Sequence, residues 1–134
     1  MGFGSGKDRA CMAFSQPVKS EGSYSKRGDA FLFVTHRPAA GERGRVSLDT
    51  GYTYQAGSKA KLTLGDLVLE LRTGASTAWL DSDAQTKRLL AAMRAGRHLV
   101  VEGISSRGTR TVDRYSLYGF SAAYKAMDKA CPAR

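Results

Sequence analysis

Apolar and polar residues alternate along much of this chain, in short runs that are separated by glycine, proline and clusters of polar residues. The clearest example is the stretch 61–71, in which leucine recurs at alternate positions on each side of Gly65-Asp66. A two-residue hairpin turn at Gly65-Asp66 would direct these leucines toward one face, so the stretch predicts two paired strands. Similar alternation, or a high density of aromatic and β-branched residues, predicts further strands at residues 10–15, 30–36, 45–50, 97–104 and 109–118.

Two segments have the apolar spacing of an amphipathic helix. The first begins at Asp81, because acidic residues suit the positive end of a helix, and it ends near Arg94 with Gly96 as its capping residue. Its apolar stripe consists of Leu89, Leu90 and Met93. The second lies at the C-terminus, and its apolar face consists of Phe120, Ala123, Tyr124, Met127 and Cys131. We expect this second helix to pack against the sheet.

These elements predict a mainly β fold of about seven short strands, with one inserted helix and one C-terminal helix. The pattern favours a β-sandwich or a related two-layer fold, and it lacks the strand-helix alternation of a parallel α/β enzyme. A length of 134 residues fits one domain. We expect the glycine-rich residues 1–8 to be a flexible N-terminal segment and residues 9–134 to form the domain.

The formal net charge of +9 favours anionic partners such as phospholipid head groups, polyanionic glycans or nucleic acid. The basic residues are scattered singly and in pairs, which is typical of a solvated surface, although folding could gather some into a patch. No apolar run is long enough to span a membrane. The N-terminus lacks the apolar stretch of a secretory signal, so export would mean that a signal has been removed.

Cys11 and Cys131 lie near opposite ends of the chain, and their separation excludes a CxxC redox motif or a local zinc knuckle. We interpret the pair as a disulfide that joins the two ends. Such a bond would stabilise the fold by about 4 to 5 kcal/mol and would persist only in an oxidising compartment. The alternative is two buried free thiols in a cytosolic protein.

Catalytic chemistry has few candidates in this sequence. Only His36 and His98 could exchange protons near neutral pH, and neither lies in a metal-ligand spacing or beside a nucleophile motif. We interpret both as rim or satisfied core histidines, and Asp81 and Asp83 as helix-start residues. The Rossmann and P-loop fingerprints are both absent from the sequence. We therefore predict a protein that is not an enzyme and that uses no metal or cofactor.

Three features are candidates for partner binding. The first is Arg27-Gly28-Asp29, the tripeptide that integrins recognise, although a glycine turn with flanking charges explains it adequately. The second is the turn 105–110, where Arg107, Arg110 and Arg114 could hold phosphate or sulfate or could remain solvated. The third is a set of tyrosines that could form an aromatic, basic face or belong to the core: Tyr52, Tyr54, Tyr115, Tyr118 and Tyr124.

Several short segments follow one another in a characteristic order along nearly the whole chain. They include Cys11-Met-Ala-Phe-Ser-Gln-Pro, Phe31-Leu-Phe-Val-Thr-His-Arg-Pro, Ala92-Met-Arg-Ala-Gly, Gly103-Ile-Ser-Ser-Arg-Gly-Thr, Tyr115-Ser-Leu-Tyr-Gly-Phe and a closing Cys131. Together they resemble the invasion-associated locus B family of alphaproteobacteria. The resemblance implies an immunoglobulin-like β-sandwich, an exported protein of the periplasm or outer envelope, and no established enzymatic activity. Family cysteines match Cys11 and Cys131, which supports the disulfide.

Two hypotheses about function follow. In the first, the chain is an exported envelope module that binds an anionic or proteinaceous partner in the periplasm or on a host cell. Its candidate contact residues are Arg107, Arg110, Arg114, Arg27 and Asp29. In the second, it is a periplasmic structural or chaperone-like factor that uses an apolar groove or a sheet edge. We expect no nucleic-acid partner, and the sequence leaves the ligand and the oligomeric state open.

Overall fold

The structure of the chain is a computed structural model that describes residues 1–5, 10–22 and 27–132. Its helices are α1 (Asp83–Ala95), α2 (Phe120–Ala130) and a 3-10 turn at Pro38–Ala40. Its strands are β1 (Gly2–Ser5), β2 (Cys11–Ser15), β3 (Lys19–Glu21), β4 (Phe31–Arg37), β5 (Glu42–Asp49), β6 (Lys59–Leu64), β7 (Leu67–Gly74), β8 (Thr77–Trp79), β9 (His98–Ile104) and β10 (Arg110–Ser116).

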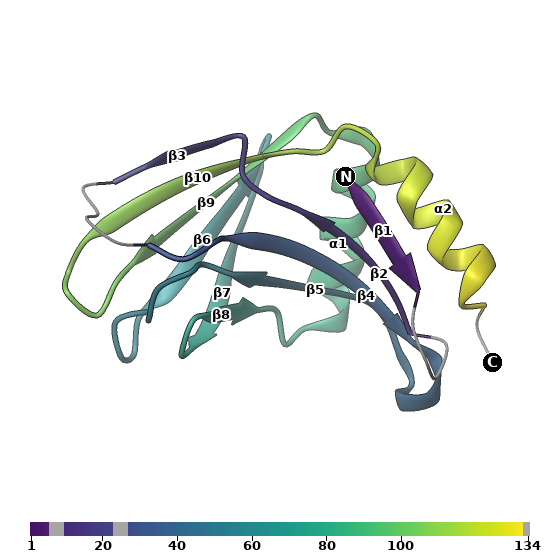
Figure 1. Cartoon of the computed structure of the whole chain (residues 1–134), viewed down its shortest axis with the longest axis horizontal. Coiled ribbons are helices and arrows are strands. Elements are labelled where there is room, and N and C mark those ends of the chain that lie inside the picture. The colour runs from purple at the N-terminus through teal and green to yellow at the C-terminus, as the bar shows by residue number, and fades with distance from the viewer. Residues whose placement is uncertain (6–9, 23–26, 133–134) are drawn as a thin grey trace.

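The strands form one antiparallel sheet in the order β1-β2-β4-β5-β8-β7-β6-β9-β10-β3. β2 and β3 follow each other directly along the chain, yet β2 pairs with β4 and β3 pairs with β10, near opposite ends of this order. The sheet therefore curls back on itself, as Figure 1 shows. Between the two strands, Val18 donates its N–H to the carbonyl of Arg114 at 2.8 Å. The curl brings two layers of strands around one shared core.

The core follows from the alternation of residues along the strands. In the hairpin of β6 and β7, Leu62, Leu64, Leu69 and Leu71 are buried, as the leucine pattern predicts. Gly65 begins the turn with a φ of 59°, a left-handed conformation that glycine adopts at little cost. Burial of each leucine stabilises the fold by roughly 1.5 to 3 kcal/mol relative to leaving it exposed.

Both predicted helices are present, but α1 begins at Asp83 rather than at Asp81, whose carboxylate accepts hydrogen bonds from Arg72 and Trp79 instead of from the helix start. Ser82 caps α1, because its Oγ accepts the N–H of Gln85 at 3.2 Å, and the buried residues of α1 form the predicted stripe. The buried face of α2 also matches the predicted one and consists of Phe120, Ala123, Tyr124 and Met127. α1 contacts β5 and β7, whereas α2 contacts β1 and β2 (Figure 1).

The predicted fold class, mainly β with an inserted helix and a C-terminal helix, is confirmed, and the two layers of the sandwich belong to one continuous sheet. The prediction for the N-terminus requires correction. Gly2–Ser5 is not a flexible segment but the edge strand β1, paired with β2. A glycine-rich strand fits here because a Cβ at Gly2 would collide with the ring of Phe14. Residues 6–8 of the expected flexible segment lie outside the described residues.

Candidate functional site

The predicted arginine turn joins β9 to β10 and is held in one conformation by Ser105. The buried Oγ of Ser105 accepts the backbone N–H groups of Arg107 at 3.2 Å and of Thr109 at 3.1 Å. Gly108 has a φ of 84° and donates its N–H to the carbonyl of Ser105 at 2.8 Å. The side chain of Arg107 is exposed, so it extends from a well-anchored turn.

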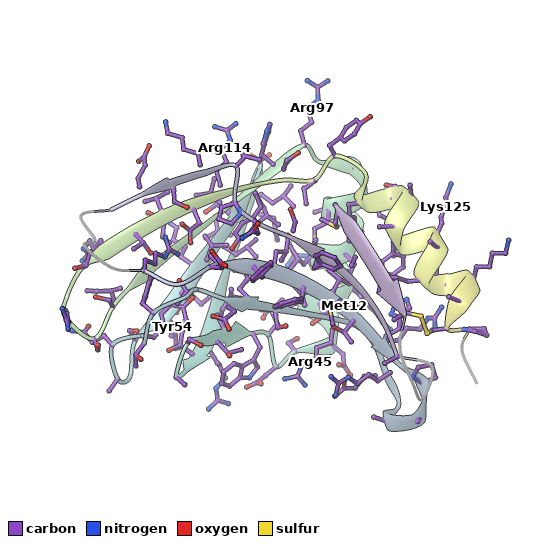
Figure 2. All side chains as sticks on the ribbon, in the orientation of Figure 1. Met12, Arg45, Tyr54, Arg97, Arg114 and Lys125 are labelled. Atoms are coloured by element: carbon purple, nitrogen blue, oxygen red, sulfur yellow. A yellow bond between two sulfur atoms is a disulfide. The ribbon has the colours of Figure 1, made fainter. Side chains whose placement is uncertain are left out.

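Arg110 and Arg114 lie on the outer face of β10. They are four residues apart on a strand whose side chains alternate between faces, so both point away from the core. The rise of an extended strand separates their Cα atoms by about 13 Å. Figure 2 shows Arg114 projecting outward from the surface of the molecule. The partly buried side chain of Val112 lies between the two arginines on the same face.

The charges around these arginines are arranged so that the lysines are paired and the arginines are not. The ion pairs of the surrounding strands are Lys19–Glu21 at 3.2 Å, Lys61–Glu102 at 3.5 Å and Lys59–Glu70 at 3.6 Å. Within the described part of the chain, the side chains of Arg107, Arg110 and Arg114 form no ion pair or hydrogen bond. Their guanidinium groups remain available to an external anion.

A shallow depression beside Arg110 adds further positive charge. It has a volume of about 280 Å³, and Lys59, Lys61, Glu102 and Val112 also line it. Three cations therefore surround a space that contains one carboxylate. Guanidinium groups bind phosphate, sulfate and carboxylate oxygens through two parallel hydrogen bonds, so this surface suits an anionic group. We call Arg107, Arg110 and Arg114 the arginine face.

Arg27, which was predicted as a contact residue, is instead engaged inside the protein. Its Nη1 donates to Asp113 at 2.8 Å, its Nε donates to the carbonyl of Thr50 at 2.9 Å, and its guanidinium lies 5.0 Å from the ring centroid of Tyr52. Its side chain is only 15% exposed and that of Asp113 only 4%. The structure therefore does not leave Arg27 available for the partner contact that the sequence suggested.

The pKa of Arg27 is set by opposing effects of this environment. Burial lowers it, but the hydrogen bond and the charge of Asp113 more than offset burial, so the pKa is raised.

The sequence analysis did not identify Asp113 as a partner of Arg27. The sequence did contain a clue to it. Thr111, Asp113 and Tyr115 alternate along β10 and point toward the core, and a buried carboxylate requires a partner.

The tripeptide Arg27-Gly28-Asp29 is consequently not displayed as a continuous recognition sequence. Gly28 donates its N–H to the carbonyl of Gly51 at 2.9 Å, which fixes the backbone beside the buried Arg27. Asp29 is exposed and lines a shallow hollow of about 300 Å³. Of the two charged residues of the tripeptide, Asp29 alone is exposed. It lies in the connection that precedes β4, far in sequence from the arginine turn between β9 and β10.

A disulfide between Cys11 of β2 and Cys131 at the end of α2 joins two residues that are 120 positions apart. Hydrogen bonds reinforce it: Arg43 donates to the carbonyl of Cys131 at 3.0 Å and to Asp128 at 2.6 Å.

His36 is fully buried, its Nε2 lies 3.0 Å from Asp128, and its Nδ1 accepts the N–H of Gly44 at 2.8 Å. These contacts confirm the interpretation of His36 as a satisfied core histidine.

Comparison with known proteins identifies the family. The family model described as invasion associated locus B (IalB) protein matches residues 3–128. This chain belongs to the invasion associated locus B family. The crystal structure of invasion associated protein b from Bartonella henselae is similar in fold, with a TM-score of 0.66 and 22% sequence identity. The match covers 95% of this chain and 90% of that one. Among curated proteins, none matches the chain.

Two further findings describe this member of the invasion associated locus B family. In residues 1–5, 10–22 and 27–132, no group of three or more His, Cys, Asp or Glu side chains is placed to hold a metal ion. No helix of the same residues has the length and apolar character needed to cross a membrane.

Alkaline pH is expected to destabilise this family member through its buried tyrosines. Burial raises the pKa of both Tyr54 and Tyr115. Because their pKa values are higher in the folded state, the unfolded chain loses these protons first, and stability falls as the pH rises above about 10. Urea denaturation at increasing alkaline pH measures this slope, and it should become shallower in a Tyr54→Phe/Tyr115→Phe variant. An unchanged slope would contradict the prediction.

Proposed function

We propose that this protein is an exported, non-enzymatic binding module of the bacterial envelope that engages an anionic partner through its arginine face. Three lines of evidence support the proposal. The chain belongs to a family named for its association with invasion, its ends are joined by a disulfide, and its net charge is +9. The disulfide favours the periplasm or the cell exterior, where such bonds persist.

The observation that carries the proposal is the contrast between paired lysines and unpaired arginines on the outer sheet. A cation that already has a carboxylate partner gains less from an external anion than a cation without one. Arg110 and Arg114 protrude from a regular strand and Arg107 from an anchored turn, so the backbone that carries the three side chains is pre-positioned. Pre-positioning lowers the entropic cost of binding and therefore favours recognition.

Charge reversal on the arginine face tests this function. We expect Arg110→Glu/Arg114→Glu to weaken binding to heparin or to vesicles of phosphatidylglycerol by about tenfold or more, since each lost charge-assisted contact contributes roughly 1.5 to 3 kcal/mol. Binding of the unaltered protein should also weaken as salt rises, because exposed charges are screened. Surface plasmon resonance with both probes separates a sulfated glycan from a lipid head group as the source of the anion.

The matched control is Arg88→Glu/Lys129→Glu, which makes the same change in charge at exposed positions on α1 and α2. Binding that falls equally in both double variants would reflect net charge alone and would contradict a specific arginine face. The proposal would also be contradicted if the unaltered protein bound neither heparin nor the vesicles.

A chaperone-like role is the second candidate, and the aromatic outer face beside the edge strand β1 favours it. Phe31 and Phe33 stack with their ring centroids 5.6 Å apart, and Phe14, which is 36% exposed, lies opposite Phe33 in the register of β2 and β4. A partner that adds a strand at this edge would bind with little dependence on salt. The chaperone-like role would be favoured if the protein captured extended peptides at high salt and if charge reversal of the arginine face left this capture unchanged.

A further inference from the structure

A second surface, remote in sequence from the arginine face, has the composition of a ligand site. It is a cleft of about 430 Å³, a volume within the usual range of small-molecule pockets. Its walls come from the start of β5, from the connection between β8 and α1, and from the first turns of α1. Figure 2 shows Arg45, one of its lining residues, projecting outward from β5.

Trp79 supplies the aromatic surface of this cleft, and its indole is fixed by its neighbours. The indole Nε1 donates to Asp81 at 3.0 Å, and Asp81 in turn pairs with Arg72 at 2.5 Å. The hydrogen bond from Arg72 lowers the pKa of Asp81, which keeps its carboxylate ionised as an acceptor. The ring extends over Gly74, where a Cβ would approach it to 3.1 Å. The indole is partly exposed and thus forms a positioned platform.

Polar groups with no partner inside the described chain stand beside this platform. Asp83 and Lys87 are exposed, lie one turn apart on α1, and form no ion pair with each other or hydrogen bond with another described side chain. They offer one acceptor and one donor on the same wall. By contrast, the hydroxyl of Thr86 already donates to the carbonyl of Ser82 at 2.9 Å.

The charges of the cleft cancel. Its lining contains the cations Arg43, Arg45 and Lys87 and the carboxylates Glu42, Asp81 and Asp83. On a protein with a net charge of +9, such a neutral region gives an anion no particular advantage. A neutral ligand that both donates and accepts hydrogen bonds and that has one flat apolar face matches these features.

We propose that the cleft at Trp79 binds a neutral oligosaccharide. A pyranose ring would place its C–H face on the indole of Trp79, and its hydroxyl groups would donate to Asp83 and accept from Lys87. Asp83 and Lys87 are exposed and the indole of Trp79 is partly exposed, so these interactions do not require the fold to change. The site is separate from the arginine face and from the function proposed for it.

The sequence contains one tryptophan, so intrinsic fluorescence reports on this cleft directly. We expect titration with tri-N-acetylchitotriose or maltotriose to give a saturable change in the emission of Trp79 that high salt does not abolish. If neither sugar changes the emission at millimolar concentrations, the proposal is overturned. A stronger and salt-sensitive response to a heparin tetrasaccharide would overturn it as well, because the ligand would then be anionic.

Substitutions on the wall of the cleft provide the second arm of the test. We expect Asp83→Ala and Lys87→Met each to weaken binding of the responding sugar by about tenfold through a lost hydrogen bond to a charged group. Arg88→Met, at the exposed position next to Lys87, is the matched control and should bind like the unaltered protein. Equal affinity in all three variants would place the sugar elsewhere. Arg110→Glu/Arg114→Glu should leave the titration unchanged, which separates this site from the arginine face.

Discussion

Replacing both cysteines by alanine is expected to lower the free energy of unfolding by about 5 kcal/mol, the largest effect of any substitution considered for this protein. The disulfide closes a loop between residues 120 positions apart, and the entropy of the unfolded chain increases with the length of the loop that is released. Since small domains are stable by only about 5 to 15 kcal/mol in total, the variant should be close to unfolding.

Urea denaturation followed by circular dichroism measures this change. Reduction of the unaltered protein should reproduce the loss, whereas the same reductant should leave the Cys11→Ala/Cys131→Ala variant unaffected. Hydrogen exchange should show the greatest local effect in α2, because the bond attaches the end of this helix to β2 and its loss leaves only non-covalent contacts there. A loss below about 1 kcal/mol would show that the chain-entropy argument does not apply to this fold.

The second large effect is expected at Asp113. Substitution of Asp113 by alanine removes the partner of a guanidinium that is itself mostly buried, so Arg27 would remain charged without compensation. Breaking a buried pair in this way costs about 3 to 5 kcal/mol, and the residual 15% exposure of Arg27 favours the lower end of that range. Chemical denaturation of the variant gives the value directly.

The double variant Arg27→Met/Asp113→Leu distinguishes an uncompensated charge from a simple loss of contacts. It removes both ionic groups and leaves apolar side chains, so it should recover most of the stability that Asp113→Ala loses. Asp66→Ala, at an exposed turn between β6 and β7, is a control for the removal of an acid and should change stability by less than about 0.5 kcal/mol. A double variant as unstable as Asp113→Ala would show that the wider network with Thr50 matters more than charge.

The arginine face illustrates how much of a site a sequence can predict. Arg107, Arg110 and Arg114 were candidates from the turn and the strand alone, and the structure does place them on an outer surface. Their distinguishing property, the lack of an internal partner, depends on which strands lie beside β10. β3 and β9 are those neighbours, and their acids already have lysine partners: Glu21 pairs with Lys19 on β3, and Glu102 of β9 pairs with Lys61 of β6.

Arg27 shows the opposite case, in which a short motif was misleading. The tripeptide suggested an exposed loop, but the residue that binds Arg27 lies 86 positions later in the chain. No local pattern around Arg27 indicates that distant carboxylate. The cleft at Trp79 was missed for the same reason, because its walls come from β5, from the connection before α1 and from α1 itself.

The disulfide predicted from the sequence is present in the structure. The sequence by itself also determined both helices, most of the strands and the inward or outward direction of most of their side chains, but it did not indicate β1, β3 or β8. Periodicity carries this information, since the period of two in strands and of 3.6 in helices fixes which residues share a face. The tertiary structure alone decided that Gly2–Ser5 adds a strand and that β2 and β3 pair near opposite ends of one curled sheet. It also decided which charges meet. These outcomes depend on contacts between residues far apart in the chain, and local periodicity does not specify them.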